Sequence, residues 1–335
     1  MKKIIINLFF VFISCAAMAQ DPLFSQYYQA PLFMNAGFTG LTERQRFVIN
    51  HRLQWPGLPQ AFSTYAASYD MYIPQVSSGI GVMFTSDKMG SVNWKTTTAS
   101  VLYSYKIRLN EALVFSPGIS FGYGTNGLDR SRLKMSDVMI QGGGSTLDPE
   151  INKIQNSNYM DFGSGFLLYS ERLWIGTSFS HMNRPQLSLL GENDRLDMRT
   201  SVHAGIKIEL SSPMRSARPV YFTPSFIYQM QGKNFSQFDA GVNFHIDPVS
   251  IGAWYRGKPF SKNENNVIDH DALILFGGLY LKNFNVGYSY DFTISSLGPG
   301  TGGAHEISIT YELRAKKRTP NKNKLIPCPA FYGRR

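Results

Sequence analysis

The chain has 335 residues, of which 43% are hydrophobic, 14% are aromatic and only 17% are charged. Average proteins carry about 25% charged residues, so the composition is charge-poor and excludes an intrinsically disordered chain. The two cysteines exclude a disulfide scaffold and a cysteine-based zinc cluster. The length allows one large β domain or two ordinary domains.

The net charge of +10 is concentrated at the C-terminal end. Residues 314–335 contain eight basic residues and no acidic residue, and Lys2 and Lys3 add two more. The remaining 23 basic residues balance the 23 acidic residues, so the body of the chain is neutral and does not suggest a nucleic-acid-binding protein. We expect residues 316–335 to form a basic tail, which is either a solvated arm or a contact for an acidic partner or an anionic cell-wall polymer.

Residues 1–19 have the pattern of a signal peptide. A basic pair, Lys2 and Lys3, precedes the apolar run from Ile4 to Ala17, which is too short to span a membrane as a helix. Ala17-Met18-Ala19 fits the small-residue cleavage rule, so we expect the mature chain to begin at Gln20. A lipoprotein signal with Cys15 acylated is the alternative, although Phe12 stands where the lipobox prefers leucine.

From about residue 45, apolar and polar residues alternate along the sequence with a period of two. Between Phe284 and Ile294, aromatic and aliphatic residues occupy even positions, and small or polar residues occupy odd positions. Successive side chains of a strand point to opposite faces, so each such run has one apolar face and one polar face. The pattern predicts fourteen strands over 45–55, 61–73, 77–86, 93–109, 111–124, 158–171, 173–182, 199–211, 220–231, 235–246, 249–257, 271–282, 284–295 and 304–315.

These strands indicate a transmembrane antiparallel β-barrel of outer-membrane type over residues 45–315. Most runs reach about ten residues or more, and a tilted membrane strand needs about nine to eleven. Aromatic residues recur near the ends of the runs, and long connections alternate with short ones. Hydrocarbon cannot hydrogen-bond backbone N–H and C=O groups, so a sheet in the membrane must close on itself to pair all of them. The polar faces, with Lys207, Glu209, Asp239 and Asp291, are expected to face a wet lumen. A soluble sandwich or tandem domains remain the alternative.

Residues 20–44 precede the first predicted strand and show no alternation of apolar and polar residues. They are aromatic-rich, and we expect either a plug folded into the lumen or a periplasmic leader, since large barrels leave a lumen to fill. The segment reads D-P-L-F-S-Q-Y-Y at 21–28 and P-L-F-M-N-A-G-F-T-G at 31–40. The chain closes with C-P-A-F at 328–331.

These ends resemble the PorP/SprF family, outer-membrane components of the type IX secretion system of Bacteroidota. The family signature D-P-x-F-S-Q-Y-Y, then P-x-x-x-N-x-x-x-x-G, is matched at Asp21, Pro22, Phe24, Ser25, Gln26, Tyr27, Tyr28, Pro31, Asn35 and Gly40. Gly79-Ile80-Gly81-Val82 and Asp87 resemble early barrel strands of the family. The chain continues four residues beyond Phe331, which departs from a family pattern that closes on C-P-x-F.

The resemblance implies a barrel without catalysis or cofactor that supports secretion or surface anchoring of a specific partner, such as an adhesin or gliding protein. It implies contact with the C-terminal sorting domain of that partner and with periplasmic secretion or motility machinery, in outer-membrane lipid. The even number of predicted strands places both termini in the periplasm, and no nucleic acid is expected to bind. Candidate partner or plug contacts are Phe24, Ser25, Gln26, Tyr27, Pro31, Asn35 and Gly40. Candidate tail contacts are Lys316, Lys317, Arg318, Lys322, Lys324, Cys328, Pro329 and Phe331.

Other functions remain possible at this point. A passive transporter or channel for a small or hydrophobic solute would have the same strand pattern. A rim protease could use Asp269-His270-Asp271, because a carboxylate can orient a histidine base, whereas the six histidines have no metal-binding spacing. Cys328 would be a lone thiol or an intermolecular disulfide partner, and the apolar loop Leu128–Asn158 could cap the mouth or contact a partner.

Overall fold

The computed structural model describes residues 21–42, 44–58, 61–90, 94–128, 156–188, 194–210, 219–233, 235–262, 268–313 and 326–330. Most of these residues are in long antiparallel strands. The strands are β1 (Gln45–Gln54), β2 (Phe62–Ile73), β3 (Ser78–Met89), β4 (Trp94–Tyr105), β5 (Ile107–Arg108), β6 (Val114–Gly127), β7 (Ser157–Tyr169), β8 (Leu173–Ser180), β9 (Arg199–Ile206), β10 (Ile208–Leu210), β11 (Val220–Gln231), β12 (Phe235–Ile246), β13 (Val249–Lys262), β14 (Ile268–Leu281), β15 (Phe284–Thr293) and β16 (Ala304–Leu313).

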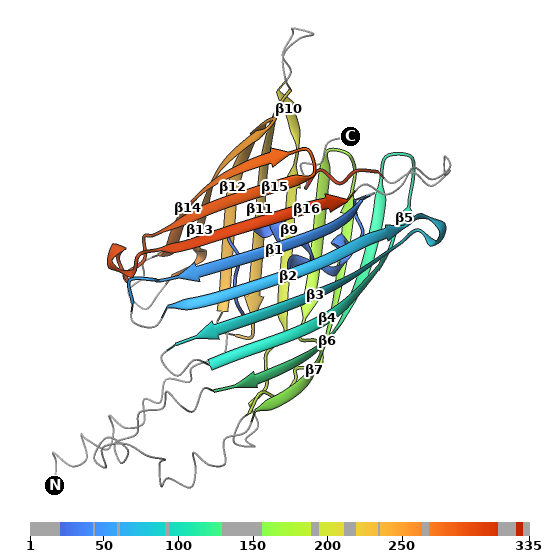
Figure 1. Cartoon of the computed structure of the whole chain (residues 1–335). Coiled ribbons are helices and arrows are strands. Elements are labelled where there is room, and N and C mark those ends of the chain that lie inside the picture. Colours follow the sequence, from blue (N-terminus) through green and yellow to red (C-terminus); the bar gives the residue numbers. More distant parts are fainter. Residues whose placement is uncertain are drawn as a thin grey trace, which may run out of the picture.

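The strands close into a single barrel (Figure 1). Each strand pairs with its sequence neighbour, β16 returns to pair with β1, and β9 pairs with β11. Because β5 and β10 are short continuations of β4 and β9, the wall contains fourteen strands, as predicted. Closure gives every strand two neighbours, which satisfies the backbone groups that an open edge would leave unpaired.

The two ends of the barrel differ in their connections. At one end, here called the short-turn end, β7 joins β8 through residues 170–172 and β14 joins β15 through 282–283. At the other end, the long-loop end, β6 joins β7 through 128–156, β8 joins β9 through 181–198, and β15 joins β16 through 294–303. This is the alternation that the sequence predicted, and it is usual for outer-membrane barrels.

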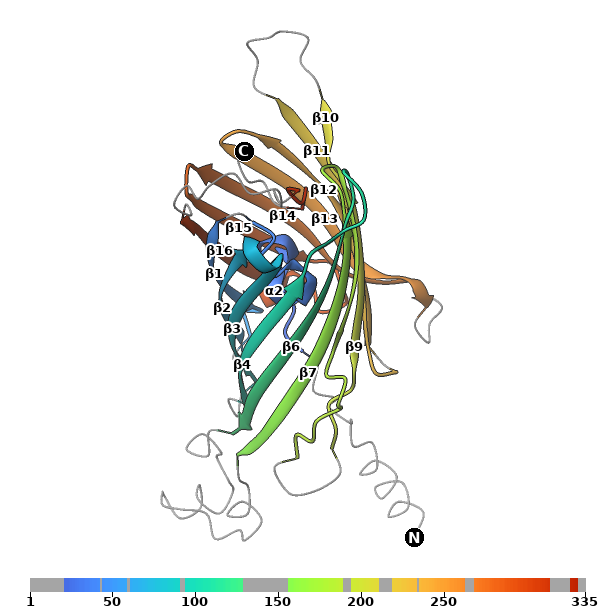
Figure 2. The same ribbon diagram turned by 90° about the vertical axis from the view of Figure 1, so that its right-hand side faces the viewer.

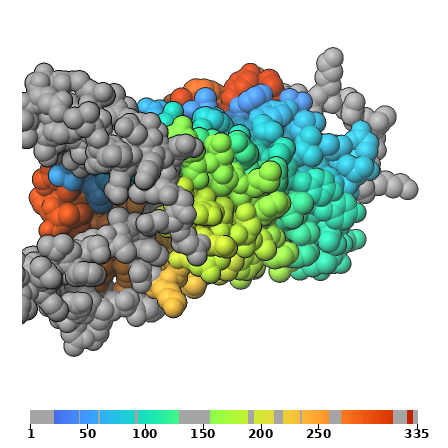
Figure 3. All heavy atoms as spheres, turned by 90° about the horizontal axis from the view of Figure 1, so that it is seen from below, coloured from blue at the N-terminus to red at the C-terminus, as the bar shows by residue number. Residues whose placement is uncertain are grey.

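The apolar side chains point outward. In β16, Ile307 and Tyr311 are exposed, whereas Glu306, Ser308 and Thr310 at the alternate positions are buried. The outer surface in view is continuous from strand to strand (Figure 3). Such an inside-out distribution suits a lipid environment, since a charge on the lipid face costs about 2–4 kcal/mol at the bilayer midplane.

Three predicted boundaries were wrong. The run 93–109 is divided at Lys106 and the run 199–211 at Lys207, and the loop predicted from Gly257 to His270 is largely strand. The pairing of β13 with β14 continues there through register shifts after Arg256 and Lys258. Alternation is lost at these shifts while backbone pairing persists, so a pattern of side chains underestimates the strand length.

Residues 21–42 lie inside the barrel, where they form short helices: η1 (Tyr27–Gln29), α2 (Pro31–Met34) and η2 (Ala36–Phe38). Figure 2 shows α2 within the ring of strands. We call residues 21–42 the lumen segment. Its side chains supply eight of the 27 buried hydrophobic residues in the described parts of the chain, including Phe24, Leu32 and Phe38, and the wall residues packed around them supply much of the rest. The described residues of this segment therefore occupy the lumen.

Candidate functional site: the occupied lumen

The lumen segment runs from one end of the barrel to the other. Asp21 contacts His181 and Gln231 at the long-loop end, whereas Gly40 contacts Asp70, near the end of β2, at the short-turn end. Because the number of strands is even, the first and last strands begin and end at the same end of the barrel, where Gln45 pairs with Leu313. The lumen segment, which precedes the first strand, crosses the length of the barrel once more. The described start of the lumen segment therefore lies at the end of the barrel opposite to residues 326–330.

An ionic contact fixes the start of the segment. The Asp21 carboxylate lies 2.7 Å from His181 Nε2 and 3.1 Å from Arg199, and His181 Nδ1 lies 2.9 Å from Asp161. Burial alone would lower the pKa of His181, but the Asp21 charge and the Asp161 hydrogen bond raise it to about 9. Burial alone would raise the pKa of Asp21, yet His181 and Arg199 hold it below its usual range. Both groups are therefore charged at neutral pH.

A buried ionic network holds Ser25 and Gln26. The Glu306 carboxylate accepts hydrogen bonds from the backbone N–H groups of Ser25 (2.6 Å) and Gln26 (3.0 Å). The Ser25 hydroxyl donates to Asp291 (2.6 Å) and accepts from the guanidinium groups of Arg52 (2.6 Å) and Arg256 (3.0 Å).

The network continues within the wall. Arg52 pairs with Asp291 (2.8 Å), and Arg256 pairs with Asp239 (3.0 Å) and Asp291 (3.1 Å). All these charged side chains are at least 97% buried. Asp239 and Asp291 were expected to face a wet lumen, and instead they lie beneath the segment. Buried charges require such pairing, because desolvation costs several kcal/mol per ion.

Aromatic and helical packing fills the middle of the lumen. Phe24 meets Phe33 edge-on at 5.1 Å between ring centroids. Tyr28 meets Trp174 edge-on at 5.4 Å. Pro31 begins α2, a position that tolerates its missing N–H. Gln26 spans this region with its side chain, donating to Ser289 and the Glu306 carbonyl and accepting from Ser308.

Asn35 connects the segment to three wall strands. Its Nδ2 donates to the carbonyl oxygens of Phe166 (3.2 Å) and Thr177 (3.1 Å) and lies 3.1 Å from His203 Nε2. Its Oδ1 accepts from the Gly37 N–H and caps η2. His203 is fully buried and stacks on Phe38 at 5.3 Å between ring centroids.

Gly40 ends the segment against the wall. Its N–H donates to Asp70 (2.7 Å), which also forms a bidentate pair with Arg46 (2.9 Å to each carboxylate oxygen). Gly40 has φ +63°, a conformation that glycine adopts without strain. A Cβ on the facing Gly79 would collide with the Thr39 carbonyl, so the two chains approach as closely as backbones can.

Residues 326–330 return to the lumen at the short-turn end. Ile326, Cys328 and Ala330 are buried in one cluster with residues of the lumen segment and with Tyr169 and Trp174. Burial raises the pKa of the Cys328 thiol to about 12, so it stays protonated. A buried neutral thiol argues against an intermolecular disulfide. Pro329 is buried as well, whereas Lys316, Lys317, Arg318, Lys322, Lys324 and Phe331 lie outside the described residues.

Enzymatic and metal chemistry finds no support in the described parts of the chain. His270 hydrogen-bonds the Tyr255 hydroxyl at 2.6 Å rather than Asp269 or Asp271. No group of three or more His, Cys, Asp or Glu side chains able to hold a metal occurs among the described residues. Most of the predicted loop Leu128–Asn158 lies outside them. No helix among them is long and apolar enough to cross a membrane.

The structure brings all seven predicted residues of the amino-terminal motif into the lumen, from Phe24 to Gly40. Sequence reasoning missed their partners on the wall, chiefly Arg52, Arg256, Glu306 and His181. The available signal was that Arg52, Arg256 and Glu306 occupy polar faces of predicted membrane strands, where each charge needs an opposite charge nearby. His181 gave no such signal, since it has φ 57° and turns out of its strand.

Solved structures resemble the chain only distantly. The Ralstonia pickettii toluene transporter TbuX is 9% identical, with a TM-score of 0.48 over 85% of this chain and 93% of that one. The Acinetobacter baumannii outer membrane protein Omp33 is 9% identical, with a TM-score of 0.40 over 82% and 99%. No curated protein matches the sequence. The barrel assignment therefore depends on the strand pairing itself.

The family comparison covers most of the chain. Residues 16–311 match the model of the type IX secretion system membrane protein PorP/SprF, which describes secretion-system components and not enzymes. The matched region contains the whole lumen segment and nearly the whole barrel wall. Membership implies partners in the secretion machinery. The chain belongs to the PorP/SprF family and is an outer-membrane β-barrel protein of the type IX secretion system.

Proposed function

We propose that this protein is a non-enzymatic docking component that supports secretion or surface anchoring of one exported protein. The observation that carries the proposal is the occupied lumen: the chain itself fills the barrel from Asp21 to Gly40 through buried ionic and backbone contacts. A barrel anchored to its own plug at so many points is poorly suited to passive transport. Its contacts with other proteins then lie at the two ends.

The short-turn end is the proposed periplasmic side. Short turns face the periplasm in outer-membrane barrels, and residues 326–330 are docked at this end. The basic stretch 316–324 would then reach the periplasmic machinery, and the sorting domain of the exported protein would bind at one of the two mouths. In this arrangement Asp21 lies at the outer mouth.

The test is deletion of the protein followed by proteomics of the cell surface and medium. We expect selective loss of one or a few surface proteins, and an unchanged surface proteome would contradict the proposal. Planar-bilayer conductance by the purified barrel would favour the solute-transporter alternative instead.

The tail is tested separately. Lys316, Lys317, Arg318, Lys322 and Lys324 are changed together to glutamine, which removes the charge and leaves the buried residues 326–330 in place. We expect normal barrel assembly and reduced co-purification of periplasmic partners. Full co-purification would exclude the tail contact. The matched control changes Lys316, Lys317, Lys322 and Lys324 to arginine, which keeps the charge.

A further inference from the structure

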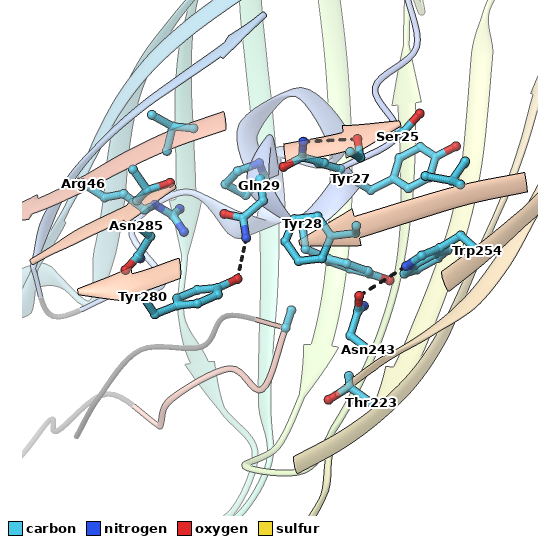
Figure 4. Close-up of a pocket in the computed structure, with 18 of the residues that line it drawn as sticks. Ser25, Tyr27, Tyr28, Gln29, Arg46, Thr223, Asn243, Trp254, Tyr280 and Asn285 are labelled. Carbon is cyan, nitrogen blue, oxygen red and sulfur yellow. Dashed lines mark hydrogen bonds between the residues drawn. The ribbon is translucent and has the colours of Figure 1, made fainter. Parts of the chain in front are cut away.

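The lumen has little free space for a ligand. Beside the lumen segment, Tyr27, Tyr28 and Trp254 line a cavity of about 60 Å³ (Figure 4). That volume holds a few water molecules and is too small for a lipid, a sugar or a peptide. Molecules of that size would bind the outer surface of the barrel instead.

Two lysines, here called the lysine pair, oppose each other on the outer surface at the long-loop end. Lys88, near the end of β3, is the register partner of Lys95, near the start of β4. Both side chains are exposed and share the outward face with Phe84 and Val101. Figure 1 shows the adjoining ends of β3 and β4 toward the lower left of the barrel. Like charges directly opposite each other on neighbouring strands repel, so an anion bound between them would stabilise this part of the wall.

No carboxylate of the described residues neutralises the lysine pair. Asp87 lies beside it in sequence, but its side chain is buried inside the barrel, where it accepts a hydrogen bond from the Thr64 hydroxyl. The described outward faces of β1–β4, β6 and β7 carry no acidic side chain, and residues 90–93, which join β3 to β4, contain none. By contrast, Lys258 at the same end of the barrel pairs with Asp269 (3.5 Å). The lysine pair therefore offers two positive charges to a group from outside the chain.

The outward faces of β3 and β4 become more polar toward the lysine pair. Closer to the middle of the wall, Val82, Phe84 and Val101 are exposed apolar side chains. Next along the two strands, Ser86 and Thr97 are register partners whose hydroxyl oxygens lie 3.5 Å apart. The surface therefore presents apolar side chains, then hydroxyls, then ammonium groups. A phosphorylated membrane lipid has the matching order of acyl chains, polar linkages and phosphate.

We propose that Lys88 and Lys95 bind the phosphate group of a membrane lipid in the leaflet at the long-loop end. Their flexible stems let both ammonium groups reach a headgroup from a lipid-facing strand, and ammonium groups bind phosphate as point charges. The Ser86 and Thr97 hydroxyls bond the polar linkage beside the phosphate, and an acyl chain packs on Phe84. The inference needs a barrel in a membrane and does not use the proposed role in secretion.

The test measures lipid binding to the full-length protein in detergent by native mass spectrometry. The probes are dimyristoyl phosphatidic acid and dimyristoyl glycerol, which share their acyl chains and differ by the phosphate. We expect tighter binding of the phosphatidic acid, weakened by about tenfold or more when Lys88→Gln and Lys95→Gln are combined. Lys88→Arg combined with Lys95→Arg keeps both charges and should bind as the unmodified protein does. Lys233→Gln, which removes an exposed charge from the turn after β11 at the same end, is the control for net charge.

Four outcomes would overturn the proposal. Equal binding of the two lipids would show that the phosphate is not recognised, and unchanged binding in the double glutamine variant would show that the lysine pair is not the site. An equal loss in Lys233→Gln would mean that only the net charge matters. Displacement of the phosphatidic acid by an equal concentration of inorganic phosphate would mean that the ligand is a free anion and not a lipid. Because the exposed lysines make no packed contact, the variants should fold, and the heat-dependent gel mobility of the barrel verifies this.

Discussion

At the long-loop end the wall holds the lumen segment through a network of paired charged side chains, whereas near the short-turn end the Arg46–Asp70 pair and the Lys106 ammonium act together with close backbone packing. Ser25 and Gln26 are held by Glu306, Arg52 and Arg256 in a closed ionic network. Thr39 and Gly40 lie directly against Gly79, and Lys106 donates to the Gly37 and Thr39 carbonyls. The first mode depends on charge balance, and the second depends on shape as well as on charge.

This contrast has a physical reason. A charge network needs every partner, because one missing member leaves another ion buried and unpaired. Close backbone packing tolerates loss of a side chain but not the addition of one. The two regions should therefore respond oppositely to truncation and to enlargement.

The largest expected effect comes from truncation in the network. Arg256→Ala leaves Asp239 and Asp291 short of a counter-charge, and we expect it to lower the free energy of unfolding by about 3–5 kcal/mol. Urea unfolding in detergent measures this loss. The control is Arg184→Ala, whose side chain is 58% exposed in its pair with Asp197 and should cost about 1 kcal/mol or less. Equal losses in both variants would show that the network does not anchor the segment.

Enlargement at the close contact should have an intermediate effect. Gly79→Ala places a methyl group against the Thr39 carbonyl, and we expect a loss of about 1–3 kcal/mol and exposure of the lumen segment. Chymotrypsin cleavage at the aromatic residues of 21–42 is the measurement. Gly277→Ala, with no atom near its added Cβ, is the matched control. Unchanged protection in Gly79→Ala would mean that the segment is not held by shape.

The smallest expected effect is local and depends on pH. The His181 pKa is raised from 6.5 to about 9, so its ion pair with Asp21 is complete below pH 6.5 and is lost as the pH rises through about 9. The Asp21 contribution is complete above its ordinary value of 3.8 and is lost only in strong acid, because its pKa is lowered. Between these limits the start of the segment should stay fixed.

Chymotrypsin cleavage near Phe24, followed from pH 7.5 to 9.5, tests this contact. Cleavage, corrected for the protease's own pH dependence, should increase across that range in the unmodified protein. It should be high and nearly constant in His181→Gln, which cannot carry the charge. A rise of the same size in both proteins would exclude His181 as its cause.

The strands of the barrel wall could be predicted closely, because the pattern that identifies each strand lies in its own neighbouring residues. Alternation in a run such as 284–295 follows directly from the two sides of a strand, and hydrocarbon outside fixes which side is apolar. The motif from Phe24 to Gly40 could be singled out from a resemblance, but its position inside the barrel remained one of two alternatives. The contacts of the C-terminal basic residues stay a prediction.

What the sequence by itself determined is the closed barrel, with its fourteen strands and its apolar exterior, because each strand carries its own pattern. Only the tertiary structure decided what fills the lumen and in which direction the lumen segment runs. Those contacts join residues up to 282 positions apart, such as Gln26 and Ser308. Pairings at such distances depend on how the strands close in space, and no periodicity along the chain records them.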